Sequence, residues 1–134
     1  MIKLTNINGN ITDVITGLVV NHVDCMDDFN PKVYDKWDIG AVAPMSGEGM
    51  GGLAHIINVT NSLYVANCYF TQSDVLFNKD RLNHCVESAV AFAAHCEYDI
   101  HISYKTWFRV GYAFLPLNTK YNITINIYDM EEEI

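Results

Sequence analysis

The residues best suited to proton transfer in this sequence are a histidine and an aspartate, His22 and Asp24, at the end of an apolar run. They are two positions apart, so on a β-strand their side chains would lie on the same face. A histidine beside a carboxylate is suited to act as a general base held by its orienting group, which makes these two the candidate catalytic pair. The alternative is that His22 is only a polar residue at a strand end.

Metal chemistry is disfavoured by the spacing of the remaining ligand-forming residues. The four cysteines show no C-x-x-C pattern, which argues against a zinc site and against a secreted disulfide framework. The other histidines have no visible partners in the sequence. The motifs G-x-x-x-x-G-K-[ST], G-x-S-x-G and H-E-x-x-H do not occur either. We therefore expect neither a metal nor a cofactor.

The elements that must position these residues alternate between short strands and one strong helix. Apolar residues recur at three and four positions from Leu82 to Cys96, which predicts a helix over about 79–96. The richest loop signal is the glycine-rich segment 44–52, and Pro31 favours a short helix at 32–37. This order predicts an α/β fold with a mixed central sheet and few helices. The expected strands are 2–7, 17–21, 55–59, 63–69, 100–104 and 121–128.

Length and composition indicate a single folded domain spanning 1–134. Half of the residues are apolar and 18% are charged, and no apolar run is long enough to span a membrane. We expect a cytoplasmic protein. The net charge of −8 with eight basic residues disfavours nucleic acid as a partner. The alternative that an acidic surface of this chain docks on a basic site of another protein stays open.

Three stretches of the sequence together resemble the macro domain, the ADP-ribose-binding family, and in particular its compact bacteriophage and bacterial forms. Gly9-Asn10-Ile11-Thr12 is similar to the family's Gly-Asp-Ile-Thr turn. Residues 20–25 are similar to a strand ending of the type Val-His-Gln-Val-Asn-Cys, and residues 63–72 to a Val-Ala-Asn-x-x-x-Gln ending. The resemblance implies a single macro-like α/β domain.

The same resemblance implies a ligand site, and each of its motifs is altered here. Asn10 would accept a hydrogen bond from the adenine amino group, while Asp24 and His22 would lie near the distal ribose. Asn30 and Lys32 stand where the first phosphate loop has glycines, and Asn30 is expected to be a ligand-binding residue there. The second phosphate loop would fall on 108–114, with Arg109, Gly111 and Tyr112 as ligand-binding residues.

These departures leave three hypotheses open. The first is a non-enzymatic pseudo-macro domain that acts by protein contact, such as a phage-type acidic inhibitor of a host protein. The second is binding of ADP-ribose or a related nucleotide derivative, and the third is its hydrolysis. We lean to the first, since both phosphate loops have lost glycines. The residues expected to contact a protein are Asp27, Asp28, Trp107, Phe108 and Phe114.

Overall fold

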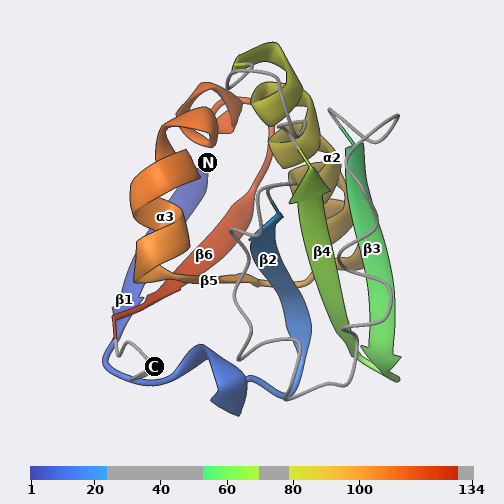
Figure 1. Ribbon diagram of the computed structural model, residues 1–134. Helices are drawn as coiled ribbons and strands as arrows, with labels where there is room; N and C mark the ends of the chain where they lie inside the picture. Colours follow the sequence, from blue (N-terminus) through green and yellow to red (C-terminus); the bar gives the residue numbers. More distant parts are fainter. Residues whose placement is uncertain (24–52, 70–78, 130–134) are drawn as a thin grey trace.

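The computed structural model describes residues 1–23, 53–69 and 79–129, which build one six-stranded sheet with helices (Figure 1). Each strand is rich in β-branched residues, whose restricted side chains suit a pleated, half-buried surface. All six predicted strands are confirmed, with shifts of a few residues at their ends. The strands are β1 (Ile2–Ile7), β2 (Gly17–Val23), β3 (Leu53–Thr60), β4 (Leu63–Tyr69), β5 (Ile100–Ser103) and β6 (Ile123–Tyr128).

The sheet is mixed, as predicted, with the strand order β1-β6-β5-β2-β4-β3. Every neighbouring pair is parallel except β3 and β4, which form an antiparallel pair joined by a short turn. The strands turn progressively across the sheet, so that β4 and β1 run in very different directions in Figure 1. The carboxyl ends of the five parallel strands therefore share one edge, which we call the carboxyl edge.

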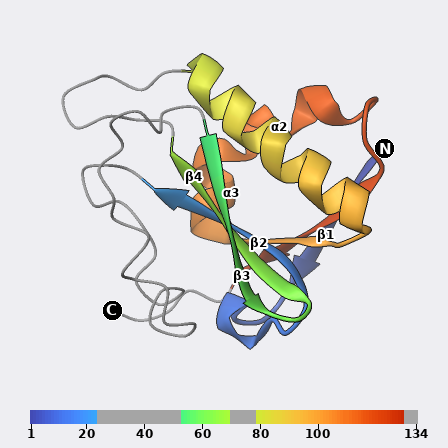
Figure 2. The ribbon, with the colours of Figure 1, turned by 90° about the vertical axis from the view of Figure 1, so that its right-hand side faces the viewer.

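Helix α2 (Lys79–Cys96) has the predicted bounds and lies across one face of β2, β3 and β4 (Figure 2). Its buried residues follow the spacing of three and four that the sequence shows. The helix ends at Cys96 because Glu97 takes a left-handed backbone conformation, with φ of 58°. The buried positions of α2 are Leu82, Cys85, Val86, Ala89, Val90 and Ala93.

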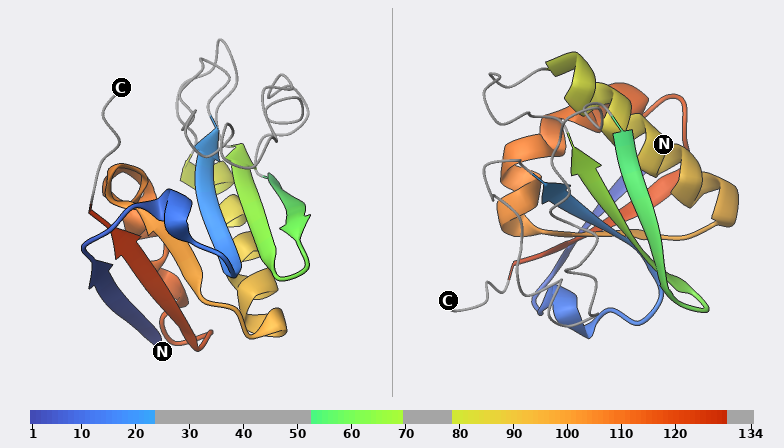
Figure 3. Two further views of the ribbon diagram at one scale, coloured as in Figure 1. Left: turned by 90° about the horizontal axis from the view of Figure 1, so that it is seen from below. Right: turned by 45° about the vertical axis from the view of Figure 1, so that its right-hand side comes forward.

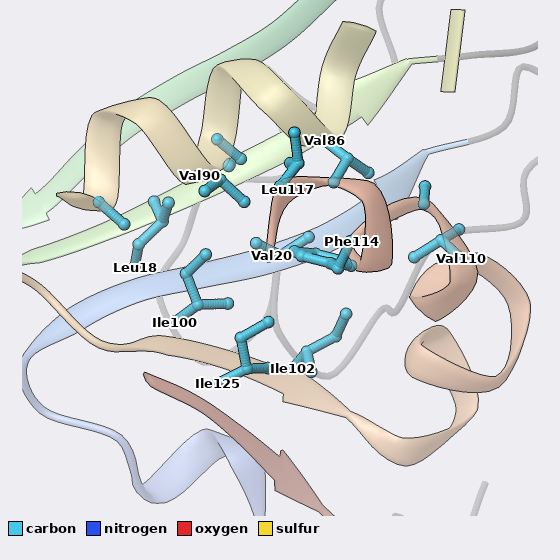
Figure 4. Close-up of a cluster of buried hydrophobic side chains, with 14 of the residues drawn as sticks. Leu18, Val20, Val86, Val90, Ile100, Ile102, Val110, Phe114, Leu117 and Ile125 are labelled. Carbon is cyan, nitrogen blue, oxygen red and sulfur yellow. The ribbon is translucent and has the colours of Figure 1, made fainter. Parts of the chain in front are cut away.

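The hydrophobic core lies between this face of the sheet and the helices that cover it. Figure 4 shows Val86 and Val90 of α2 above Val20, Ile100 and Ile125 of the sheet. The segment that follows β5 closes the core with further side chains, among them the fully buried Phe114. That segment consists of α3 (Tyr104–Val110), η2 (Gly111–Ala113) and η3 (Leu115–Leu117).

The opposite face of the sheet buries a more polar set of side chains. Alternation along β2 places Val19 and Asn21 there, away from Leu18 and Val20 in the core. The short helix η1 (Ile11–Asp13) lies on a different side of β2 from α2 (Figure 3). We call this surface of the sheet the second face.

One local prediction is wrong. The sequence predicts an irregular loop over 108–114, whereas the structure has the end of α3 and η2 there. The segments 32–37 and 44–52 lie outside the described residues. Among the described helices, none has the length and apolar character that crossing a membrane requires.

Candidate functional site

The carboxyl edge brings together several polar residues that the sequence places at strand ends. In open α/β sheets, ligands bind outside the carboxyl ends of parallel strands. Asn21 lies near the end of β2, Asn67 near the end of β4, and Ser103 ends β5. Asn10 follows β1, which runs parallel to the same set. This edge is therefore the candidate binding site.

Two buried asparagines form the centre of this edge. Asn21 and Asn67 are register partners on adjacent parallel strands, and both belong to the second face. Asn21 is only 2% exposed, yet its Nδ2 has no hydrogen-bond partner among the described residues. A buried donor without a partner costs about 1–3 kcal/mol. Such a group calls for an explanation, and a polar ligand atom is one.

Neither asparagine is among the site residues that the sequence predicts. The signal that identifies them is a polar residue interrupting an apolar run, in Leu18-Val19-Val20-Asn21 and in Val65-Ala66-Asn67. In a strand buried on both faces, an amide side chain lacks water and requires a specific partner.

Asn10 is placed at the carboxyl edge, where it caps η1. Its Oδ1 accepts a hydrogen bond from Thr12 N at 3.0 Å and another from Thr12 Oγ1 at 2.8 Å. A carbonyl oxygen has two lone pairs, so both are engaged. An adenine amino group would have to compete with Thr12 for this oxygen, and the base contact stays a prediction.

The predicted second phosphate loop, 108–114, coincides with the end of α3 and with η2. The helix begins directly after β5. The hydroxyl of Ser103 accepts a hydrogen bond from Thr106 N at 3.3 Å and donates one to Thr106 Oγ1 at 3.0 Å. This capping favours a helix at a position where a glycine loop was expected. The backbone amides of residues 108–110 are consequently committed to helix geometry, so the predicted loop is not formed there.

Gly111 matches the predicted loop in register, and the structure gives it a role in packing. It is buried, and a Cβ at this position would lie 2.7 Å from ring carbons of Trp107. The missing side chain therefore makes room for the indole. Trp107 is half-buried and also packs against Phe114, with ring centroids 5.5 Å apart.

The predicted protein-contact residues separate into two groups. Phe114 is 0% exposed, so its predicted contact role is wrong: it belongs to the core. Phe108 is 76% exposed, and Arg109 and Tyr112 are also on the surface of this segment. Their contacts with a ligand or a partner stay predictions. Asp24, Asp27, Asp28 and Asn30 lie outside the described residues, as does the side chain of His22.

A hydrogen-bonded histidine lies on the second face, two residues before the end of β5. His101 Nε2 lies 3.0 Å from Thr16 O, and its Nδ1 lies 2.8 Å from Tyr128 Oη. Nε2–H therefore donates to the carbonyl while the tyrosine hydroxyl donates to Nδ1, which fixes a neutral imidazole. Nearby, Asn126 Nδ2 donates to Asp99 Oδ2 at 3.3 Å. The sequence shows none of these partners.

Burial lowers the pKa of His101 below its ordinary value, against the opposing effects of the Thr16 hydrogen bond and the charge of Asp99. The unfolded chain therefore takes up a proton at a pH where the folded chain does not. Stability is full above the ordinary pKa of about 6.5 and falls as the pH decreases from there toward the lower folded pKa.

We expect the free energy of unfolding to decrease by at most about 1.4 kcal/mol per pH unit from this group. Urea titrations between about pH 7.5 and 5, the window around an ordinary histidine pKa, measure this decrease. His101→Gln is the control, because it removes this titration and leaves the other histidines. Equal slopes for the two proteins would contradict the account.

Within the described part of the chain, no group of histidine, cysteine and carboxylate side chains is arranged to hold a metal ion. The polar residues of the carboxyl edge are amides and hydroxyls, which are neutral hydrogen-bonding groups. Their chemistry suits recognition of an uncharged polar group, such as a base or a ribose hydroxyl.

Comparison with solved structures agrees with this architecture. A macrodomain protein from Streptomyces coelicolor superposes with a TM-score of 0.76 at 15% identity, covering 96% of this chain and 100% of that one. A protein from Bacteroides thetaiotaomicron gives 0.73 at 19% identity, with coverage of 96% and 100%. The macrodomain of Thermus aquaticus DarG gives 0.68 at 11% identity, with coverage of 97% and 100%. No protein-family model and no curated protein sequence matches.

The fold and its polar edge define an α/β domain with a mixed six-stranded sheet. More particularly, the chain has the fold of a macrodomain, as the resemblance in its sequence implies.

Proposed function

We propose that this chain binds ADP-ribose or a related nucleotide derivative at the carboxyl edge, as a binding module and not as a hydrolase. The observation that carries the proposal is the buried Nδ2 of Asn21, which has no partner among the described residues. It lies beside Asn67 at the edge where α/β sheets take their ligands. A ligand hydroxyl, ring nitrogen or carbonyl oxygen would satisfy it.

The remaining predicted contacts are arranged around this centre. Asn10 would lie near the base, Asp24 and His22 near the distal ribose, and Arg109 near a phosphate. Residues 108–110 lie in the later part of α3, where their amides bond inside the helix, so the side chain of Arg109 would hold a phosphate in their place. Hydrolysis by a water that such a backbone cradle positions is therefore disfavoured relative to binding.

Calorimetric titration with ADP-ribose tests the proposal. In Asn21→Leu, an apolar side chain of the same branching replaces the orphan donor, so the desolvation cost that is removed offsets the strain of the larger methyl groups and the fold should be retained. The affinity for ADP-ribose should fall by about tenfold or more, because one buried hydrogen bond to the ligand is lost.

Asn126→Leu is the matched control. Asn126 lies on the second face too, but it donates to Asp99, is separated from β2 by β5, and is level with Val19, two residues before Asn21. This variant should keep the affinity of the unaltered chain. No heat of binding to the unaltered chain at millimolar ADP-ribose would exclude the proposal, and unchanged affinity in Asn21→Leu would exclude the role of Asn21.

A second function, protein contact by a pseudo-macro domain, is favoured by the surface of α3. Phe108 is a large aromatic residue that lies almost entirely in solvent. Apolar side chains gathered on one surface mark sites of protein contact. The expected phage-type inhibitor of a host protein would be one form of this function. Two results together would support it: the unaltered chain does not bind ADP-ribose, and Phe108→Ala loses a protein contact that the unaltered chain makes.

A further inference from the structure

We infer that the exposed surface of α3 and the two turns after it binds a short acidic segment of another protein. The inference rests on the second proposed function, protein contact, and specifies the chemistry of the partner. This α3 surface consists of Tyr104, Phe108, Tyr112 and Leu115 with the two basic residues Lys105 and Arg109.

The aromatic side chains of the α3 surface come from α3 and the turn after it. Tyr104 and Phe108 are four residues apart on α3, so they lie on the same side of that helix, and Tyr112 follows in η2. They are 49%, 76% and 44% exposed, and Leu115 is 61% exposed. The rings of Tyr104 and Phe108 lie with centroids 6.3 Å apart. Aromatic residues of this kind supply most of the energy at protein contacts.

The charge of this segment is opposite to that of the whole chain. Residues 104–120 contain three basic residues and no acidic residue, while the chain has a net charge of −8. Lys120 pairs with Glu87 of α2. Lys105 and Arg109 lie on α3 itself, beside the aromatic side chains, and both are exposed. Complementary charge at such a surface selects an acidic partner and repels a basic one.

A second copy of this chain fits the surface less well. Symmetric pairing of two α3 surfaces would bring Lys105 and Arg109 of both copies together, and like charges at an interface are unfavourable. The small apolar footprint also suits a segment of chain, because a stable contact between whole domains takes about 20–30 residues on each side.

The test uses two synthetic peptides of equal length and equal leucine and tryptophan content. One carries glutamates and the other carries lysines at the same positions. Each is titrated into the ¹⁵N-labelled full chain, and the backbone amide shifts are followed. We expect the acidic peptide to shift amides of residues 104–115, with an affinity that decreases as salt is added.

Two surface variants make the result specific. Phe108→Ala and Lys105→Glu should each lower the affinity for the acidic peptide by about tenfold. Ile15→Ser is the matched control, because Ile15 is an exposed apolar residue outside the α3 surface. It should bind the peptide like the unaltered chain.

Three outcomes would overturn the inference. They are the absence of shifts at millimolar acidic peptide, equal binding of the basic peptide, and self-association that Phe108→Ala abolishes. Titration of the same sample with ADP-ribose separates this inference from the carboxyl-edge proposal, since the α3 variants leave Asn21 and Asn67 intact.

Discussion

Replacing Gly17 by alanine is expected to lower the free energy of unfolding by about 3 kcal/mol or more. Gly17 begins β2 with φ of 111°, a conformation that side-chain-bearing residues rarely adopt. A Cβ would also lie 2.7 Å from His101 Nε2 and 2.8 Å from the carbonyl oxygen of Asp99. Neither atom can move freely, because His101 is hydrogen-bonded through both nitrogens and Asp99 O accepts from Leu18 N.

Urea unfolding followed by circular dichroism measures this effect. Gly9→Ala is the matched control, since a Cβ at Gly9 would make only an ordinary contact of 3.5 Å with Ile7 Cγ2. Gly9 also has no positive φ. We expect this control to change the free energy of unfolding by less than about 0.5 kcal/mol. A mild effect at Gly17, similar to that at Gly9, would show that the start of β2 is not held as described.

Truncating Phe114 is expected to destabilise the fold by about 3–5 kcal/mol, whereas truncating Phe108 is expected to change little. Phe114 is 0% exposed and packs among Val20, Ile102 and Val110 in the cluster of Figure 4. Its removal leaves a cavity that the rigid sheet cannot fill. Phe108 has few protein contacts to lose, since it lies in solvent.

Thermal and urea unfolding of the two alanine variants, measured side by side, compare the same chemical change at two positions. The pair is informative because the sequence predicts one role, protein contact, for both residues. Similar destabilisation in Phe108→Ala and Phe114→Ala would contradict the assignment of one to the core and the other to the surface.

The architecture was largely predictable from the sequence because its signals are local and periodic. The spacing of apolar residues from Leu82 to Cys96 determines both the helix and its buried face. The alternation of Ile123, Ile125 and Ile127 likewise determines which face of β6 enters the core. The macrodomain fold followed from motifs at strand ends, and the comparison with solved structures confirms it.

A loop was predicted where α3 ends, because the similarity to a glycine-rich phosphate loop was given more weight than the local helix signals. Residues 104–110 contain no glycine or proline, and Ser103 is a favourable cap at their start. These local features favour a helix. The single glycine that matches the loop, Gly111, is explained by contact with Trp107, which a sequence alignment cannot show.

The candidate site was only partly predictable, because its partners are distant along the chain. His101 contacts Tyr128, which is 27 residues away, and Thr16, which is 85 residues away. Asn21 and Asn67 meet only through the pairing of β2 with β4. Such pairs depend on strand order, and a single sequence does not determine strand order.

The claim that the carboxyl edge is the ligand site is tested most directly by mapping ADP-ribose on the ¹⁵N-labelled chain by nuclear magnetic resonance. We expect shifts at the backbone and side-chain amides of Asn21 and Asn67 and at the amide of Ser103, where the parallel strands end. Gly17 and Asp99, at the opposite ends of β2 and β5, should stay unshifted. Shifts confined to those amino ends, or none at millimolar ligand, would contradict the claim.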